Sequence, residues 1–171
     1  MDGQEAPLFE ATLALADSVY RFLRRWVGND IAAEELTQET LVIAWQKHRQ
    51  LKNASSLKVW LLQIARRVAI DRARKIARDK SIEFESIEDI PTKQPPLLSL
   101  LSDQENVKIV MNAMEQLPPR QRLVLFLTAV EGLTPMEIAD VLSITPAAVR
   151  ASLVVARERM RAQFGTSLIE K

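Results

Sequence analysis

The chain of 171 residues contains no cysteine and a single histidine, His48. The absence of cysteine excludes disulfide scaffolds, thiolate zinc sites, iron–sulfur clusters and thiol nucleophiles. One histidine cannot form a histidine-rich metal site, and we expect neither a metal nor a cofactor. No apolar run approaches the roughly 18–20 residues that a membrane span requires, and residues 1–5 are acidic where a secretory signal is basic. We therefore expect a cytoplasmic protein without membrane insertion.

Glycine is also scarce, with four residues, and β-branched residues rarely alternate with polar ones. This leaves no good candidate for a β-strand. Apolar residues instead recur at steps of three and four, which is the period of an amphipathic helix, and 47% of the chain is hydrophobic. The sequence predicts an all-α protein with enough apolar surface for a real core.

The net charge of +1 by itself argues against a nucleic-acid partner, but the charge is unevenly distributed. Basic and acidic residues number 14 and 10 in residues 1–80, 2 and 7 in 81–115, and 7 and 5 in 116–171. Two basic blocks therefore flank an acidic one. Three prolines in residues 81–96 forbid a continuous helix, so we expect an exposed linker there.

This division predicts two small helical domains, residues 6–80 and 97–166, joined by the acidic linker 81–96. In the first domain the apolar pattern predicts one helix from Leu8 to Trp26 that ends near Gly28, with its arginines, Arg24 among them, off the apolar stripe. Asp30 is the expected N-cap of a second helix, and a serine in residues 52–56 is the expected cap of a third.

The second domain has clearer boundaries. Pro119 suits the first turn of a helix that should end at residues 131–133. Thr134 and Glu137 form a capping-box pattern that opens a short helix to about Leu142, and Thr145 with Pro146 opens a longer one to about Phe164. A short helix, a turn and a longer helix are typical of a DNA-binding helix-turn-helix, although an ordinary helical hairpin has the same spacing.

Three polar clusters are candidates for binding. Seven cations against two aspartates between Arg66 and Lys80 suit DNA phosphates, or form a solvated helix end. Glu35, Gln38 and Glu39 lie within about one helical turn and could dock a basic protein partner, although a helix N-terminus favours acidic residues anyway. The last helix is also basic, and its cations are Arg150, Arg157, Arg159 and Arg161.

In this order, these segments resemble the extracytoplasmic-function (ECF) group of bacterial RNA polymerase sigma factors. Residues 30–45 look like the helix that docks on the polymerase, and residues 60–75 are similar to the helix that reads the −10 promoter element. Residues 117–122 and 133–160 look like the helix-turn-helix that binds the −35 element. The resemblance covers most of residues 8–164.

The resemblance implies three sets of site residues and no catalytic or metal residue. The β′ clamp helices of core RNA polymerase would be met by Glu35, Leu36, Gln38 and Glu39. The −10 element, with one flipped base, would be met by Lys52, Asn53, Arg66, Arg67, Arg74 and Lys75. The −35 duplex would be met by Thr134, Arg150, Ser152 and Arg157. The β flap of the polymerase, promoter DNA and an anti-sigma protein are the further implied partners.

The sequence departs from the family pattern at several places, and residues 146–148, Pro-Ala-Ala, replace the usual Gly-Thr pair near the start of the last helix. Ser152 and Val155 stand where the family usually has cations, and Arg67 stands where it often has asparagine. The main hypothesis is an alternative sigma factor that directs promoter-specific initiation. A sigma-like mimic that titrates an anti-sigma protein without reading DNA remains open, and a stand-alone repressor would leave residues 30–45 unexplained. An enzyme is the least favoured class.

Overall fold

The computed structural model describes residues 5–51, 53–79, 110 and 112–164, and contains no strand in those segments. The expected linker 81–96, the apolar segment after it up to residue 109, and Lys52 lie outside the described residues. The chain divides into two compact units: the first contains the helices up to Asp79, and the second contains α6, the N-terminal part of α7, and α8. The all-α fold class is confirmed.

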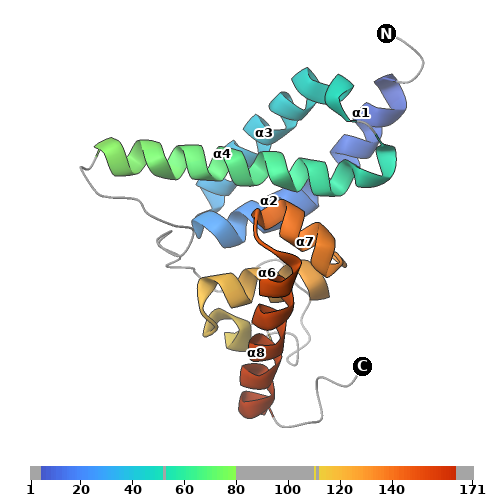
Figure 1. Ribbon diagram of the computed structural model, residues 1–171. Coiled ribbons are helices and arrows are strands. Elements are labelled where there is room, and N and C mark those ends of the chain that lie inside the picture. Colours follow the sequence, from blue (N-terminus) through green and yellow to red (C-terminus); the bar gives the residue numbers. More distant parts are fainter. Residues whose placement is uncertain (1–4, 52, 80–109, 111, 165–171) are drawn as a thin grey trace. The chain divides into compact units, whose positions relative to one another are not determined.

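The first unit consists of four α-helices and two short 3₁₀ turns, coloured blue to green in Figure 1. The helices pack against one another, with the long α4 alongside α2 and α3 (Figure 1). Side chains no more than 1% exposed form the core: Val19, Phe22, Leu23, Leu36, Leu61 and Leu62. The elements are α1 (Glu5–Ala14), α2 (Ala16–Val27), α3 (Asp30–Lys47), η1 (His48–Gln50), η2 (Ala54–Ser56) and α4 (Leu57–Asp79).

The single helix predicted from Leu8 to Trp26 is in fact two helices. The break lies at Leu15, whose φ of −95° and ψ of 0° depart from regular helix geometry. Its backbone N–H donates to the carbonyl of Thr12, three residues back, and not to the residue four back. Apolar periodicity continues across this break, so the sequence pattern alone could not reveal it. Gly28 ends α2 with a φ of 67°, as predicted.

The start of α3 also differs from the prediction. The N-cap is Asn29 and not Asp30, because the Asn29 side chain accepts the backbone N–H of Ala32 at 2.9 Å. Asp30 instead pairs with Arg24, which is only 5% exposed although the sequence placed it off the apolar stripe. The Arg24 hydrogen bond, and then the one from the Tyr20 hydroxyl, lower the pKa of the Asp30 carboxyl. Burial of charge at Arg24 is therefore compensated by a carboxylate.

The second unit contains helical residues 112–115, α6 (Pro119–Ala129), α7 (Pro135–Leu142) as far as Ala139, and α8 (Pro146–Phe164). Helix α6 packs against α8. Val124, Phe126 and Leu127 of α6 and Val149 of α8 are fully buried. Gly132, with a φ of 69°, lies in the turn after α6 and confirms the predicted stop.

The helix starts of the second unit follow the predicted capping chemistry. The Thr134 hydroxyl accepts the Glu137 N–H at 3.3 Å, and the Glu137 carboxylate accepts the Thr134 N–H at 2.8 Å. The hydroxyl of Thr145 accepts the N–H of Ala148 at 3.1 Å at the start of α8. Ser143, with a φ of 55°, forms the left-handed turn between the two helices. These contacts fix the geometry of the helix-turn-helix.

Within the described segments, no individual helix has the length and apolar composition needed to cross a membrane. Helices α7 and α8 meet the length and composition criteria only when taken together, and they are bent by 108° relative to each other.

Replacing the capping threonine tests this geometry. Thr134→Ala removes the side-chain acceptor of the N-cap, so we expect a loss of about 1 kcal/mol in the free energy of unfolding. Thr134→Ser keeps the hydroxyl and is the matched control, with an expected loss near zero. Urea unfolding followed by circular dichroism gives both values. Equal losses in the two variants would contradict the importance of the capping box.

Candidate polymerase-binding and nucleic-acid-binding surfaces

The acidic cluster lies on the N-terminal half of α3. Glu35, Gln38 and Glu39 are exposed, whereas Leu36 is 1% exposed and belongs to the core. Leu36 therefore supports this surface from inside and does not form part of it. Glu35 accepts a hydrogen bond from Arg72 of α4 at 3.1 Å, in an ion pair whose side chains are each about half exposed. The pair links the acidic surface of α3 to the basic helix α4.

Helix α4 carries the basic block on a solvent-facing surface. Arg67, Arg72, Arg74, Lys75 and Arg78 are exposed. Arg67, Asp71, Arg74 and Arg78 follow one another at steps of four, three and four residues. These steps place the four side chains along one side of the helix. The Arg74 guanidinium lies 4.0 Å from the Asp71 carboxylate, which is long for an ion pair. The charge of Arg74 is therefore largely uncompensated. This side of α4 is suited to a row of phosphates.

Arg66 differs from its neighbours in the basic block because it is half-buried. Burial, and then the positive charge of Arg74, lower the pKa of its guanidinium. An arginine remains charged at neutral pH under such a shift. Arg66 therefore offers less of its guanidinium to a partner than the exposed cations do.

The segment before α4 is held by local hydrogen bonds. The Asn53 side-chain oxygen accepts the N–H of Ser55 at 3.0 Å, and the Ser56 hydroxyl donates to the Asn53 carbonyl at 2.7 Å. Asn53 is therefore the residue that caps the short 3₁₀ turn η2, which leads directly into α4. Asn53 is exposed and is held at the start of η2, while Lys52 lies outside the described residues.

A cleft of about 300 Å³ separates parts of α3 and α4. The sequence analysis did not find it, because it depends on the register of two helices far apart along the chain. The sequence does contain a signal, since Glu39, Ile43 and Lys47 recur every four residues on one side of α3. The cleft is lined by Glu39, Ile43, Lys47, Gln50, Trp60, Gln63, Ile64, Arg67, Val68 and Asp71.

The cleft joins residues that the sequence assigned to different partners. Glu39 was assigned to the polymerase and Arg67 to the −10 element, yet both line this cleft. The remaining −10 candidates on α4, which are Arg66, Arg74 and Lys75, are not among the residues that line it.

In the second unit, α8 presents a mixed surface. Arg150 and Arg157 are exposed, Ser152 is half-buried, and Thr134 is exposed at the start of α7. Val154 and Val155 are 55% and 37% exposed, so the outer side of α8 is partly apolar.

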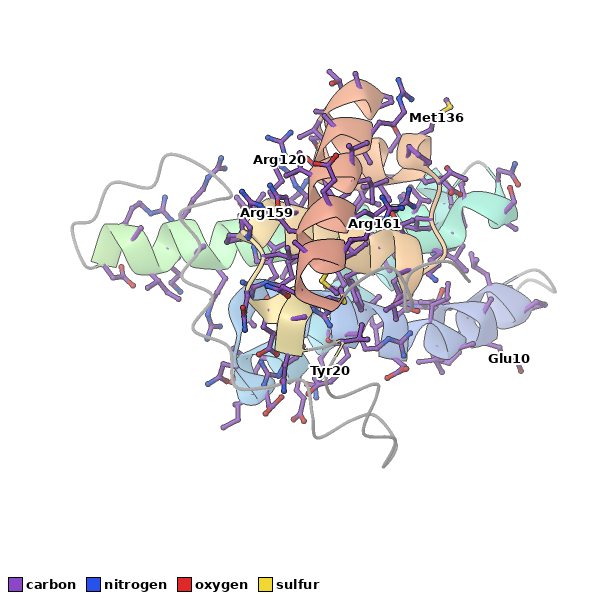
Figure 2. All side chains as sticks on the ribbon, turned by 90° about the horizontal axis from the view of Figure 1, so that it is seen from below. Glu10, Tyr20, Arg120, Met136, Arg159 and Arg161 are labelled. Atoms are coloured by element: carbon purple, nitrogen blue, oxygen red, sulfur yellow. The ribbon has the colours of Figure 1, made fainter. Side chains whose placement is uncertain are left out.

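Further along α8, Arg159 donates to the Gln121 side chain of α6 at 3.0 Å. Figure 2 shows Arg159 and Arg161 on different sides of α8. Arg159 thus helps to hold α8 against α6, while Arg161 is exposed on another side.

Within the described residues, no group of three or more acidic or histidine side chains is arranged to hold a metal ion. The available chemistry is that of charged and hydrogen-bonding surfaces: an acidic patch on α3, a basic helix α4 and a helix-turn-helix. Together they define an all-α, two-unit protein built to bind macromolecules.

Comparison with known proteins identifies the family. Residues 13–79 match the model of Sigma-70 region 2, and residues 108–160 match Sigma-70, region 4. The chain is 30% identical over 148 residues to the ECF RNA polymerase sigma factor SigM of Bacillus subtilis, covering 86% of this chain and 89% of SigM. It therefore belongs to the ECF RNA polymerase sigma factors.

Other relatives differ in length. The ECF sigma factor SigE of Mycolicibacterium smegmatis is 28% identical over 147 residues, and the match covers 85% of this chain but 57% of SigE. SigX of Bacillus subtilis is 30% identical, with 78% of this chain and 71% of SigX covered.

Two solved structures share the fold. The sigma factor RpoE from Bartonella quintana, solved in complex with the anti-sigma factor NepR, gives a TM-score of 0.64 at 23% identity, covering 88% of this chain and 91% of RpoE. CnrH, solved with the cytosolic domain of CnrY, gives a TM-score of 0.61 at 19% identity, covering 94% of this chain and 89% of CnrH.

The exposed end of α4 generates a prediction about salt dependence. Replacing Arg74 and Lys75 together by alanine should weaken promoter binding and reduce the slope of log affinity against log salt by up to about two, since each phosphate contact contributes roughly one. The slope is measured by fluorescence anisotropy of labelled promoter DNA with the reconstituted holoenzyme. An unchanged slope would mean that this end of α4 is only solvated.

Proposed function

We propose that the chain is an alternative sigma factor that binds core RNA polymerase and directs promoter-specific initiation through −10 and −35 elements. The observation that carries this proposal is the packing of α3 against α4. This packing holds an acidic surface suited to a protein partner and a basic helix suited to DNA in one rigid unit. The second unit contributes a helix-turn-helix with a fully formed capping box.

The acidic surface of α3 is the proposed contact with the β′ clamp helices. Glu35, Gln38 and Glu39 would supply its polar groups, with Leu36 holding the helix in place from the core. The Glu35–Arg72 ion pair is exposed on both sides, so a partner could replace it at little cost. The β flap is the proposed polymerase contact of the second unit.

The DNA contacts divide between the two units. At the −10 element, Arg66, Arg74 and Lys75 would contact phosphates. Arg67 would hold the flipped base, and Lys52 and Asn53 would border its pocket. The −35 contacts would be made by Thr134, Arg150, Ser152 and Arg157. Flipping a base costs a few kcal/mol of unstacking, which contacts in a pocket must offset. Nucleotide transfer would belong to the polymerase, and we assign no covalent chemistry to this chain.

The proposed domain boundaries remain residues 6–80 and 97–166, with the acidic linker 81–96 between them. An anti-sigma protein is a further proposed partner, since the similar sigma factor RpoE was solved in complex with the anti-sigma factor NepR. We place the chain in the cytoplasm, where the polymerase acts.

A sigma-like mimic is the second candidate. The exposed Val155 and the half-buried Ser152 on α8 favour it, because they reduce the positive charge of the −35 surface. The row of exposed cations on α4 argues against it, since a decoy for an anti-sigma protein has no use for phosphate contacts.

In vitro transcription separates these candidates. The chain is combined with core RNA polymerase from the same bacterium and a library of randomised promoters. The proposed function predicts enriched transcripts that share a −10 and a −35 sequence. Tight binding to core polymerase without any promoter-specific transcript would instead refute the proposed function and leave the mimic as the remaining candidate.

The docking surface on α3 is tested by Gln38→Ala combined with Glu39→Ala, which should abolish core binding and leave the helical content intact. Size-exclusion chromatography with core polymerase and circular dichroism measure the two effects. Glu34→Ala with Gln46→Ala is the matched control, because it changes the same residue types at other exposed positions of α3. Unchanged core binding in the first variant would place the docking surface elsewhere.

A further inference from the structure

The cleft between α3 and α4 combines opposite charges with apolar side chains. Its side chains include Glu39 and Lys47 from α3, and Arg67 and Asp71 from α4. In the described part of the chain, the side chains of Glu39, Lys47 and Arg67 form no hydrogen bond or ion pair. Donors and acceptors on both walls are therefore available to a ligand.

The interior of the cleft suits a flat ring. Ile43, Ile64 and the buried Val68 supply apolar walls, and the half-buried indole of Trp60 lies among them. Aromatic side chains stack on nucleobases, and a flipped base is read by hydrogen bonds at its edge together with such stacking. The combination of apolar and charged side chains fits a nucleobase better than it fits a phosphate, because Glu39 and Asp71 would repel an anion.

We propose that this cleft selects guanine as the flipped base of the −10 element, with Arg67 and Glu39 as the specificity-determining residues. This inference rests on the proposed function and adds the identity of the base. Arg67 donates to guanine O6 and N7, which is the commonest specific contact of arginine with a base. Glu39, on the opposite wall, accepts from guanine N1–H and the N2 amino group. Guanine thus has acceptors on the edge that would face Arg67 and donors on the edge that would face Glu39.

The proposal changes the role of two residues. Arg67 becomes a reader of the base and not a phosphate contact, in contrast to Arg74 and Lys75. Glu39 lies at the border of the acidic surface and contributes to DNA recognition as well. A residue that reads a base changes the preference between bases, whereas a phosphate contact weakens binding to all sequences alike.

The test uses the holoenzyme of the full chain and core polymerase on a promoter from the randomised library. Each non-template position of the −10 element is varied among the four bases, and open-complex formation is measured by permanganate reactivity. We expect guanine to be preferred at one position by about 5- to 100-fold, the range of a bidentate base contact. At that position 7-deazaguanine, which lacks N7, and inosine, which lacks the N2 amino group, should each reduce the preference.

The variant Arg67→Asn identifies the residue responsible. It should weaken the guanine preference and abolish the penalty for 7-deazaguanine, while the penalty for inosine, which reports the Glu39 contact, is retained. Arg78→Ala, an exposed arginine of α4 outside the cleft, and Glu34→Gln on α3 are the matched controls and should leave the base preference unchanged. The base analogues require no substitution in the protein, so the test does not depend on folding of the variant.

Two results would overturn the proposal while leaving the sigma function intact. One is promoter-specific transcription without a guanine preference at any −10 position. The other is an equal loss on all four bases with Arg67→Asn, which would make Arg67 a phosphate contact. The absence of any selected promoter would instead refute the proposed function itself, together with this inference.

Discussion

The packing of α3 against α4 over the core of the first unit is the constraint on which the proposed function depends. Leu36 of α3 and Leu61 and Leu62 of α4 are no more than 1% exposed, so the two helices share one interior. Close-packed protein interiors have low compressibility, so they transmit small displacements of one helix to the other. The same contact fixes the acidic surface of α3, the row of cations on α4 and the cleft between them.

Local chemistry made the second unit predictable from its sequence. Thr134, Glu137 and Thr145 specify two helix starts through capping bonds within three residues, and the structure contains these bonds. Pro119 and Pro146 lie in the first turn of their helices, where proline is favoured. The first unit was harder, because the decisive contacts connect distant residues. The break at Leu15 is invisible to apolar periodicity, and Arg24 is buried because Asp30, six residues later, neutralises it. The cleft required the relative register of α3 and α4.

The candidate site was likewise only partly predictable from the sequence. Sequence resemblance picked out exposed side chains of α3 and α4, but it could not show that Leu36 points inward or that Glu39 and Arg67 line one cleft. The whole-chain charge of +1 is equally incomplete as a guide. The positive net charges of residues 1–80 and 116–171 are nearly cancelled by the negative net charge of residues 81–115. The two positive segments nevertheless contain the proposed DNA contacts.

The central claim is that the two units of one chain bind two different elements, −10 and −35, of the same promoter. Site-specific photocrosslinking tests it most directly, with a benzophenone side chain at Lys75 on α4 or at Ala151 on α8 of the holoenzyme bound to a selected promoter. The account predicts DNA crosslinks at the −10 element from Lys75 and at the −35 element from Ala151. Crosslinks from either position only to protein, or both to the same DNA element, would contradict it.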